Sequence, residues 1–211
     1  MDGTITKFNL DYKAARQRAL MELEKRGLLT PDMTTDISLY VLLDRLRANM
    51  EPEKFLTLRT TCYGFFEEME LKAAGQVTLQ PGAVETLRAL KSKPLKLGLV
   101  TNNSRTGTDL TLNRLNLSGI FDEIVTRDDC DEMKPAAAPV LKILAALNVP
   151  AEASILVGDG VIDILAAKAA GIRSAAVTPD PFPLKRTLNA EPDYLLGSLR
   201  DLPALIDLLN S

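Results

Sequence analysis

The chain of 211 residues contains no histidine and only two cysteines. Without histidine, Ser-His triads, Cys-His dyads and histidine-ligated zinc sites are excluded. Cys62 and Cys130 do not have the spacing of metal ligands, and two cysteines cannot build a disulfide framework. We therefore expect a reduced, cytoplasmic setting, in which any catalysis must rely on carboxylates, lysine and hydroxyl groups.

Long apolar runs and a strong charge of either sign are also missing. No run approaches the ~20 residues of a membrane span, and the first residues do not form a basic and then apolar secretory leader. The net charge of −3, from 25 basic and 28 acidic residues, gives no electrostatic reason to expect nucleic acid or an anionic membrane as a partner. We expect one globular domain or a core with a modest insertion, and nothing in the sequence indicates the oligomeric state.

Residues 154–171 have the pattern of a strand, a tight turn and a helix. Residues 154–157 form a short apolar run, the chain turns at Gly158, and Gly171 occupies the position that follows a helix end. The predicted helix carries an apolar stripe at i, i+3, i+4 and i+7, formed by Ile162, Leu165, Ala166 and Ala169. This order is half of a βαβ unit, in which ligands bind at the carboxyl ends of the strands.

Two carboxylates, Asp159 and Asp163, lie at this expected ligand-binding edge. Carboxylates so close together favour a hard cation such as Mg²⁺ between them. The structural alternative is that Asp159 only caps the helix. The pattern alone does not decide between the two.

Strands and helices alternate from residue 79 to the end of the sequence. The predicted strands are 95–100, 123–125, 154–157, 174–177 and 194–196. This alternation predicts an α/β fold with a doubly wound, Rossmann-like parallel sheet. We place this core at residues 1–7 and 78–211.

Residues 8–77 instead read as helical and predict an inserted α-helical cap. Asp11 is expected to begin the first helix and Pro52 the third. The apolar stripe of the second helix is formed by Leu39, Leu42, Leu43 and Leu46. Basic residues of this segment could face an anionic substrate, although solvated helix faces carry such residues routinely.

Two further positions have both a chemical and a structural interpretation. Thr101 follows the predicted buried strand 95–100, where its hydroxyl can bond a phosphoryl oxygen or simply begin the next helix. Lys134 lies between an acidic run and Pro135, which restricts the lysine backbone. A lysine held in this way can act as a point charge on phosphate, or it can be an exposed residue that balances its acidic neighbours.

Four short motifs occur in an order and spacing that resemble one known family. They are Asp-Gly-Thr at 2–4, Val-Thr-Asn at 100–102, Lys-Pro at 134–135 and Val-Gly-Asp-x-x-x-Asp at 157–163. The chain resembles the haloacid dehalogenase (HAD) superfamily, and within it the phosphoglycolate-phosphatase-like members with a helical cap after the first motif. Each motif alone is weak, but four in order over essentially the whole chain are a strong signal.

The resemblance implies a Mg²⁺-dependent phosphatase that acts on small phosphorylated metabolites through an aspartyl-phosphate. In such enzymes one aspartate attacks phosphorus, and the aspartate two residues later protonates the leaving group. Asp2 matches this second position, and Thr101, Asn102 and Lys134 match the residues that bind the phosphoryl group. A hydroxyl, an ammonium and a metal around that group would stabilise the charge of its transition state.

The resemblance also implies the metal ligands. The backbone carbonyl of Asp2 and the carboxylate of Asp159 would bind Mg²⁺. Asp163 would be a further acidic partner at the metal, or would orient the site or Lys134.

One departure from the family pattern concerns the nucleophile. The pattern is Asp-x-Asp-Gly-Thr after an apolar strand, and this sequence starts at x, so the nucleophilic aspartate would lie one residue before Met1. The strand that normally lies in the middle of the sheet would be absent as well. Three interpretations are open: Met1 is an internal residue of a longer chain, the protein folds but only binds phosphorylated ligands, or Asp2 replaces the nucleophile. A shift of two residues along the strand end disfavours the third.

The phosphatase hypothesis thus has two alternatives. One is a non-catalytic protein that binds phosphorylated ligands. The other is a dehalogenase or phosphomutase on the same scaffold. Dehalogenation needs no Mg²⁺, so the pair Asp159 and Asp163 disfavours it, and nothing in the predicted cap indicates transfer of phosphate back to a sugar.

Overall fold

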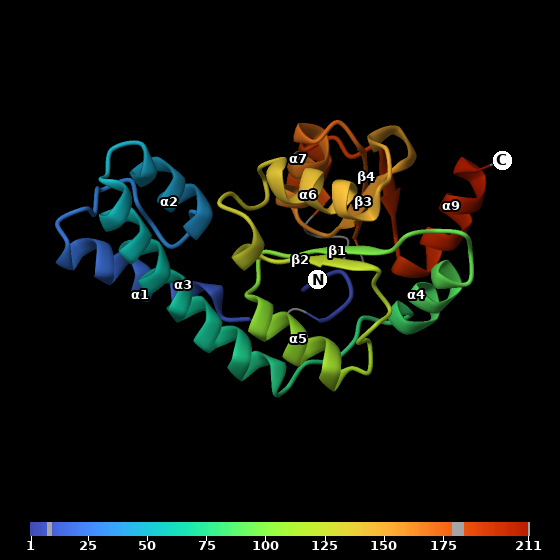
Figure 1. Ribbon diagram of the computed structural model, residues 1–211, viewed down its shortest axis with the longest axis horizontal. Helices are drawn as coiled ribbons and strands as arrows, with labels where there is room; N and C mark the ends of the chain where they lie inside the picture. The colour runs from blue at the N-terminus through green and yellow to red at the C-terminus, as the bar shows by residue number, and fades with distance from the viewer. Residues whose placement is uncertain (8–9, 179–183, 211) are drawn as a thin grey trace. The chain divides into compact units, whose positions relative to one another are not determined.

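The computed structural model describes residues 1–7, 10–178 and 184–210 (Figure 1). The chain divides into two compact units. One unit, here called the core, consists of Met1–Phe8 and Val77–Ser211, and the other, the cap, is Asn9–Gln76. The cap is therefore inserted in the chain between a short N-terminal segment and the rest of the core.

The core contains five short strands that all pair in parallel. They are β1 (Gly98–Val100), β2 (Glu123–Val125), β3 (Ile155–Gly158), β4 (Arg173–Val177) and β5 (Tyr194–Leu196). Among the described residues they form two sheets, β1-β2 and β3-β4-β5. Val100 lies opposite Val125 in the first sheet, and Gly158 lies opposite Ala176 in the second. All are joined by helical crossovers, as parallel pairing requires.

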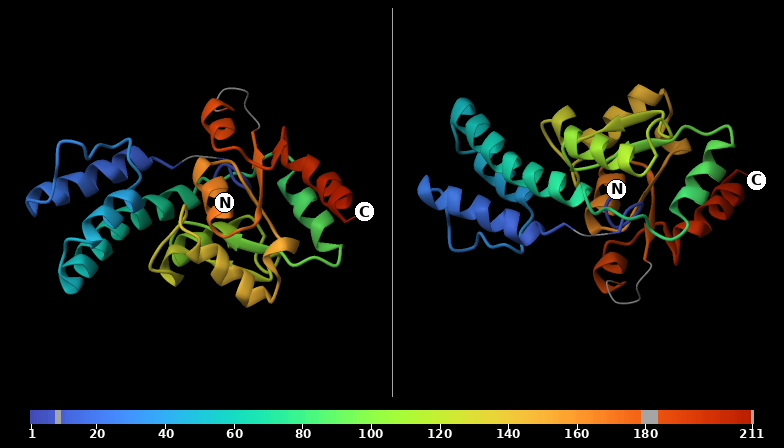
Figure 2. Two further views of the ribbon diagram at one scale, coloured as in Figure 1. Left: turned by 90° about the horizontal axis from the view of Figure 1, so that it is seen from above. Right: turned by 90° about the horizontal axis from the view of Figure 1, so that it is seen from below.

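Helices cover these strands. They are α4 (Ala83–Lys91), α5 (Arg105–Arg114), α6 (Ala138–Leu147), α7 (Val161–Ala169), α8 (Leu184–Asn189) and α9 (Leu202–Leu209). Helix α6 packs on β1 and β2, and α7 packs on β3 and β4. In Figure 1, α5 and α6 lie on opposite sides of the β1–β2 pair, and in both views of Figure 2 α4 runs beside α9. The architecture is the α/β fold predicted from the alternation of elements.

The structure differs from the predicted sheet in two respects. The single doubly wound sheet is split in the described residues, because no strand lies between β1 and β3. β1 is also shorter than the predicted strand 95–100: it begins at Gly98, since residues 95–97 pair with no neighbouring strand. Helix α8 was not predicted, because three prolines precede it, and these prolines lie outside the described residues.

The predicted apolar stripe of α7 was wrong except at Ala166, which is buried. Ile162 and Leu165 are exposed, whereas the buried face contains Ile164, Ala167 and the carboxylate-bearing Asp163. Packing on both β3 and β4 selects the small alanines, which let the helix approach the sheet closely, and leaves the two larger side chains outside. The left-handed backbone expected at Gly171 is confirmed by its φ of 70°.

The cap consists of three helices, α1 (Tyr12–Lys25), α2 (Leu39–Arg47) and α3 (Pro52–Ala74). Asp11 begins α1 as predicted, because its carboxylate accepts a hydrogen bond from the Ala14 amide at 3.0 Å. The four leucines of the α2 stripe are all buried. α3, the longest helix with 23 residues, packs against both α1 and α2 (Figure 2). Across the described parts of the chain, every helix is too short or too polar to span a bilayer.

Candidate active site

The site forms where the carboxyl ends of β1 and β3 meet. Thr101 directly follows β1 and is buried, and its backbone N–H donates to the Val125 carbonyl of β2 at 3.0 Å. Asp159 directly follows β3. Polar side chains at the ends of parallel strands are where an α/β fold places its ligand site.

The N-terminal turn closes the site from a second direction. The carbonyl of Met1 accepts hydrogen bonds from the amides of Thr4, Ile5 and Thr6, so residues 1–6 fold back on themselves. The Thr4 hydroxyl donates to Oδ1 of Asp159 at 2.6 Å. This bond joins the first residues of the chain to the end of β3.

Gly3 is required at its position by this close approach. Its φ is 83°, in the left-handed region, and a Cβ atom there would lie 2.0 Å from Oδ2 of Asp159. Gln80 secures the same turn, because its side-chain amide donates to the Gly3 carbonyl at 2.9 Å. Any side chain at residue 3 would displace the Asp159 carboxylate.

The Asp2 carboxylate is held by two side chains. Oδ1 accepts from the Thr6 hydroxyl at 2.9 Å, and Oδ2 accepts from Nδ2 of Asn103 at 2.6 Å. Thr6 and Asn103 are both buried. The carboxylate that the family resemblance assigns to proton transfer is therefore fixed in orientation by residues from two distant parts of the chain.

Lys134 is buried at the centre of the site, so the interpretation of an exposed lysine was wrong. Its Nζ donates to the Val100 carbonyl, the last of β1, at 2.8 Å and to Oδ1 of Asp163 at 2.6 Å. An ammonium has three N–H donors, and these two contacts use two of them. Lys134 thus links the end of β1 to the start of α7.

Asp163 forms the ion pair with Lys134 and also accepts a hydrogen bond at the N-terminus of α7. Its other oxygen, Oδ2, accepts from the Gly160 amide at 3.1 Å at the start of α7. Burial opposes its ionisation, but the Lys134 ammonium, the Met1 amino group and the hydrogen bonds from Lys134 and Gly160 together outweigh burial, and the pKa of Asp163 is lowered. A Cβ at Gly158 would lie 2.3 Å from Cγ of Asp163, which explains glycine at the end of β3.

Asp159 does not cap α7, so that alternative was wrong. Gly160 is the capping residue, and Asp163 supplies the side-chain contact. Burial raises the pKa of Asp159, and the nearby Asp163 carboxylate adds to this against the Thr4 hydrogen bond. Within the described residues no lysine or arginine forms an ion pair with Asp159.

Asn102 contacts the loop that carries Lys134, because its Nδ2 donates to the Lys134 carbonyl at 2.9 Å. It follows Thr101 in the turn after β1, and this bond ties that turn to the lysine. The structure thus brings together all six residues singled out from the sequence, namely Asp2, Thr101, Asn102, Lys134, Asp159 and Asp163.

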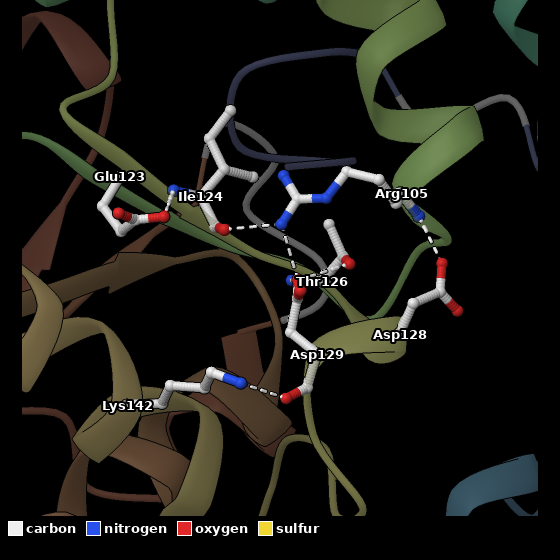
Figure 3. Close-up of polar contacts among 7 residues, drawn as sticks. All are labelled: Arg105, Glu123, Ile124, Thr126, Asp128, Asp129 and Lys142. Carbon is white, nitrogen blue, oxygen red and sulfur yellow. Dashed lines mark hydrogen bonds and ion pairs between the residues drawn. The ribbon is translucent and has the colours of Figure 1, made fainter.

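A cluster of polar contacts anchors the far end of the same loop (Figure 3). Nη2 of Arg105 donates to Oδ2 of Asp129 at 2.6 Å and to the Ile124 carbonyl at 2.8 Å. The same Asp129 oxygen accepts from the amide and the hydroxyl of Thr126, both at 2.7 Å, and Nζ of Lys142 donates to the Asp129 carbonyl. Asp129, one residue of the acidic run before Lys134, therefore helps to fix the loop between β2 and the lysine.

Sequence reasoning did not identify Thr6, Asn103 or Gln80 as parts of the site. Thr6 and Asn103 stand beside two of the motifs, so proximity to a motif was an available signal. No pattern pointed to Gln80, which reaches Gly3 across 77 positions of the sequence.

The donor set fits Mg²⁺ held by few protein ligands. Mg²⁺ usually takes one or two carboxylates, and waters and substrate phosphate complete its octahedron. Asp159 provides a half-buried carboxylate that lacks an ion-pair partner in the described residues, whereas Asp163 is engaged with Lys134. No group of three acidic, cysteine or histidine side chains converges in the part of the chain described by the structure, so an all-protein metal cage does not exist there.

A family model described as haloacid dehalogenase-like hydrolase matches residues 1–177. The chain belongs to this family. The fold and the superfamily resemblance drawn from the four motifs are thereby confirmed, as is the expectation of an enzyme scaffold.

Individual relatives agree with this membership. The chain is 32% identical over 210 residues to a protein named phosphoglycolate phosphatase from Aquifex aeolicus, an alignment that covers 98% of this chain and 94% of the relative. It is 34% identical over 122 residues to the pyrophosphatase PpaX of Anoxybacillus flavithermus, which covers 58% of this chain and 57% of that protein. The crystal structure of a hydrolase from Pseudomonas syringae superposes with a TM-score of 0.70 at 22% identity, covering 100% of this chain and 96% of the other, and shows the same fold.

Proposed function

We propose that this chain is the scaffold of a Mg²⁺-dependent phosphatase that hydrolyses phosphate monoesters of small metabolites. Family membership and the relationship to a protein named phosphoglycolate phosphatase support a HAD-type phosphatase. The observation that carries the proposal is the buried Lys134, whose Nζ joins the Val100 carbonyl, one residue before Thr101, to Asp163 of α7. An ammonium, a hydroxyl and an acidic metal site suit a phosphoryl group, whose oxygens carry the charge.

Lys134 and Thr101 would bind the phosphoryl oxygens. Asp163 fixes the lysine ammonium in position, so that its remaining N–H can point at substrate. Asn102 supports this arrangement through the Lys134 carbonyl. Catalysis then relies on donors that are already oriented before substrate arrives.

Asp2 would transfer the proton to the leaving group. Its carboxylate is fixed by Thr6 and Asn103, which prevents it from turning away from the site. The backbone carbonyl of Asp2 and the carboxylate of Asp159 would hold Mg²⁺, which neutralises charge between an anionic nucleophile and an anionic substrate when bound.

The attacking carboxylate is proposed to be an aspartate joined directly before Met1. Asp2 is a poor candidate for this role, because both of its oxygens already accept hydrogen bonds from Thr6 and Asn103. A residue attached to the amino group of Met1 would lie among Lys134, Asp159 and Asp163, the charged groups that surround this nitrogen.

The test is Mg²⁺-dependent phosphate release from an aryl phosphate by two proteins. One is the 211-residue chain, and the other carries an apolar strand ending in aspartate before Met1. We expect release only from the extended protein, and we expect Asp159→Asn to lower it by about 10²-fold or more. An aspartate-to-alanine change in the added residue is the matched control.

The outcomes separate the alternatives. Turnover by the extended protein that is unchanged in Asp159→Asn contradicts the phosphatase assignment. Absence of release together with a rise in melting temperature on adding Mg²⁺ and inorganic phosphate indicates a binding protein. Halide release or transfer to a sugar phosphate would instead indicate the dehalogenase or the phosphomutase.

A further inference from the structure

One arginine of the core is buried next to the turn that follows β1, although none of the four sequence motifs contains it. Arg127 is 2% exposed and begins a short 3₁₀ helix, η1 (Arg127–Asp129), shortly after β2. A guanidinium stays charged at physiological pH, so its burial costs free energy unless its N–H groups are hydrogen-bonded. The contacts of Arg127 therefore show what this burial achieves.

Arg127 binds two successive carbonyls of the turn after β1. Its Nη1 donates to the Asn102 carbonyl at 3.3 Å, and its backbone N–H donates to the Asn103 carbonyl at 3.1 Å. Both asparagines directly follow Thr101. The side chain and the backbone of one residue thus hold two neighbouring peptide groups, so the turn cannot rotate without breaking both bonds.

The first of these peptide groups reaches the Thr101 hydroxyl. The carbonyl of Asn102 and the N–H of Asn103 belong to one planar trans peptide and point in opposite directions. With its carbonyl directed at Arg127, this peptide donates its N–H to Oγ1 of Thr101 at 3.3 Å. A hydroxyl oxygen that accepts a hydrogen bond still has its own proton to donate. The peptide therefore orients Thr101 as a donor, which is the role that a phosphoryl oxygen requires.

The same two asparagines connect the turn to the rest of the site. Nδ2 of Asn103 donates to Oδ2 of Asp2 at 2.6 Å, and Nδ2 of Asn102 donates to the Lys134 carbonyl at 2.9 Å. Because Arg127 holds the backbone of both asparagines, a shift of this turn would move both side-chain contacts as well.

The polar cluster of Figure 3 fixes the element that carries Arg127. Oδ2 of Asp129, at the end of η1, accepts from the Thr126 amide and from Arg105. The Arg105 backbone N–H donates to Oδ2 of Asp128, also in η1, at 2.7 Å. η1 is thus anchored to the start of α5, and Arg127 extends from an element with a defined position.

We propose that Arg127 is a positioning residue of the phosphoryl-binding turn. It holds the peptide between Asn102 and Asn103 in the orientation that directs the Thr101 hydroxyl at a phosphoryl oxygen. This role rests on the proposed phosphatase function, because it requires that Thr101 bind phosphate. The structural alternative is that Arg127 stabilises the loop and leaves the hydroxyl unaffected.

The experiment measures the Kd of inorganic phosphate in the presence of Mg²⁺ by calorimetry, below the melting temperature of every variant. The 211-residue chain is compared with Arg127→Met, Arg127→Lys, Thr101→Val and the double variant Arg127→Met/Thr101→Val. Arg173→Met is the matched control. Arg173 also donates to a backbone carbonyl, that of Glu152 at 3.0 Å, but it lies at the amino end of β4, opposite to the site.

We expect Arg127→Met to weaken phosphate binding by about 10-fold, and Arg173→Met to change it by less than about twofold. Arg127→Lys keeps the charge without the planar fork and should lose less. In the Thr101→Val background, Arg127→Met should cause almost no further loss, because the hydroxyl through which it acts is absent.

Unchanged affinity in a folded Arg127→Met variant would overturn the proposal. Losses from Arg127→Met and Thr101→Val that simply add would also overturn it, because a purely structural role gives additive losses. If Arg127→Met does not fold, Arg127→Lys takes its place, and its smaller loss must disappear in the Thr101→Val background in the same way.

Failure of the proposed function is distinguished by hydrogen exchange at the Asn103 amide, which needs no phosphate. A wild-type chain that does not bind phosphate would contradict the phosphatase assignment. Faster exchange of this amide in Arg127→Met than in Arg173→Met would still support the hold of Arg127 on the peptide. Equal exchange in the two variants would overturn it.

Discussion

The core and the cap differ in how many polar and charged side chains they bury. Among the described residues of the cap, Glu70 alone is a buried charged or polar side chain, and the remaining interior is apolar. The core buries threonines, serines, an asparagine, an arginine, a lysine and an aspartate, several of them at the ends of β1 and β3. The cap is therefore stabilised by burial that many sequences could supply, whereas the core depends on particular pairs of polar atoms.

The difference also explains where each unit is sensitive to change. When a side chain in an apolar cluster is truncated, the free energy of unfolding falls in proportion to the volume of the cavity. The surrounding side chains relax partly into that cavity. Removal of one partner from a buried ion pair strongly lowers the free energy of unfolding, because the other partner stays buried without a counter-charge. Three predictions test this contrast.

The largest effect is expected for Lys134→Met. Asp163 would keep a buried carboxylate without its ammonium, and the free energy of unfolding should fall by about 3–5 kcal/mol in urea titration. The double variant Lys134→Met/Asp163→Asn should recover most of this loss, because asparagine can still accept from the Gly160 amide. A single variant that costs less than about 1 kcal/mol would contradict the importance of the pair.

The second prediction concerns the cap. Leu42→Ala removes a fully buried side chain of α2, and a loss of about 2–5 kcal/mol is expected. Leu56→Ala, at a position that is 52% exposed on α3, is the control and should change stability by no more than about 0.5 kcal/mol. Hydrogen exchange should accelerate in α1, α2 and α3. Equal acceleration in β4 would show that the two interiors do not behave as separate units.

The smallest of the three effects is expected at Asp129, in the cluster of Figure 3. Burial would raise the pKa of this carboxyl, but the hydrogen bonds from Thr126 and the charge of Arg105 outweigh burial, and the pKa is lowered. A lowered pKa means that the stabilisation is present above the unfolded value of 3.8 and disappears as the pH falls through the folded value. Asp129→Asn should cost about 1 kcal/mol at pH 7 and nothing in strong acid.

The control for this pH dependence is Glu68→Gln, which removes an exposed ion pair with Arg18. We expect no measurable change, since solvent screens such pairs. If the stability difference between wild type and Asp129→Asn is the same at pH 7 and in strong acid, the ionised carboxyl is not the source of the stabilisation.

Much of the fold could be predicted from local patterns. The α2 leucines, the Asp11 cap and the strand at 123–125 follow from periodicity and capping chemistry, and the structure confirms each. The buried face of α7 could not be predicted in this way, because alanines carry little hydrophobic signal and their burial depends on how closely β3 and β4 approach. The split of the sheet depends on tertiary pairing that no local pattern encodes.

The candidate site was predictable where a motif carries its chemistry in the sequence. Thr101 directly follows its strand as expected, and Lys134 is more deeply buried than an acidic neighbourhood suggests. The pairing of Asp2 with Asn103 was not predictable, because the two residues stand 101 positions apart and only the folded chain brings them together.

The hydrogen bond from Thr4 to Asp159 also sets an order of events during synthesis. It joins residues 155 positions apart, so the N-terminal turn cannot take its final place until β3 has been made. At a ribosomal speed of about 5–20 residues per second, this delay is roughly 10–30 s. The contacts within the cap close much earlier, since they lie within residues 9–76. The cap of the nascent chain can therefore fold before the candidate site is complete. The long-range closure that completes the site should be among the slow steps of folding.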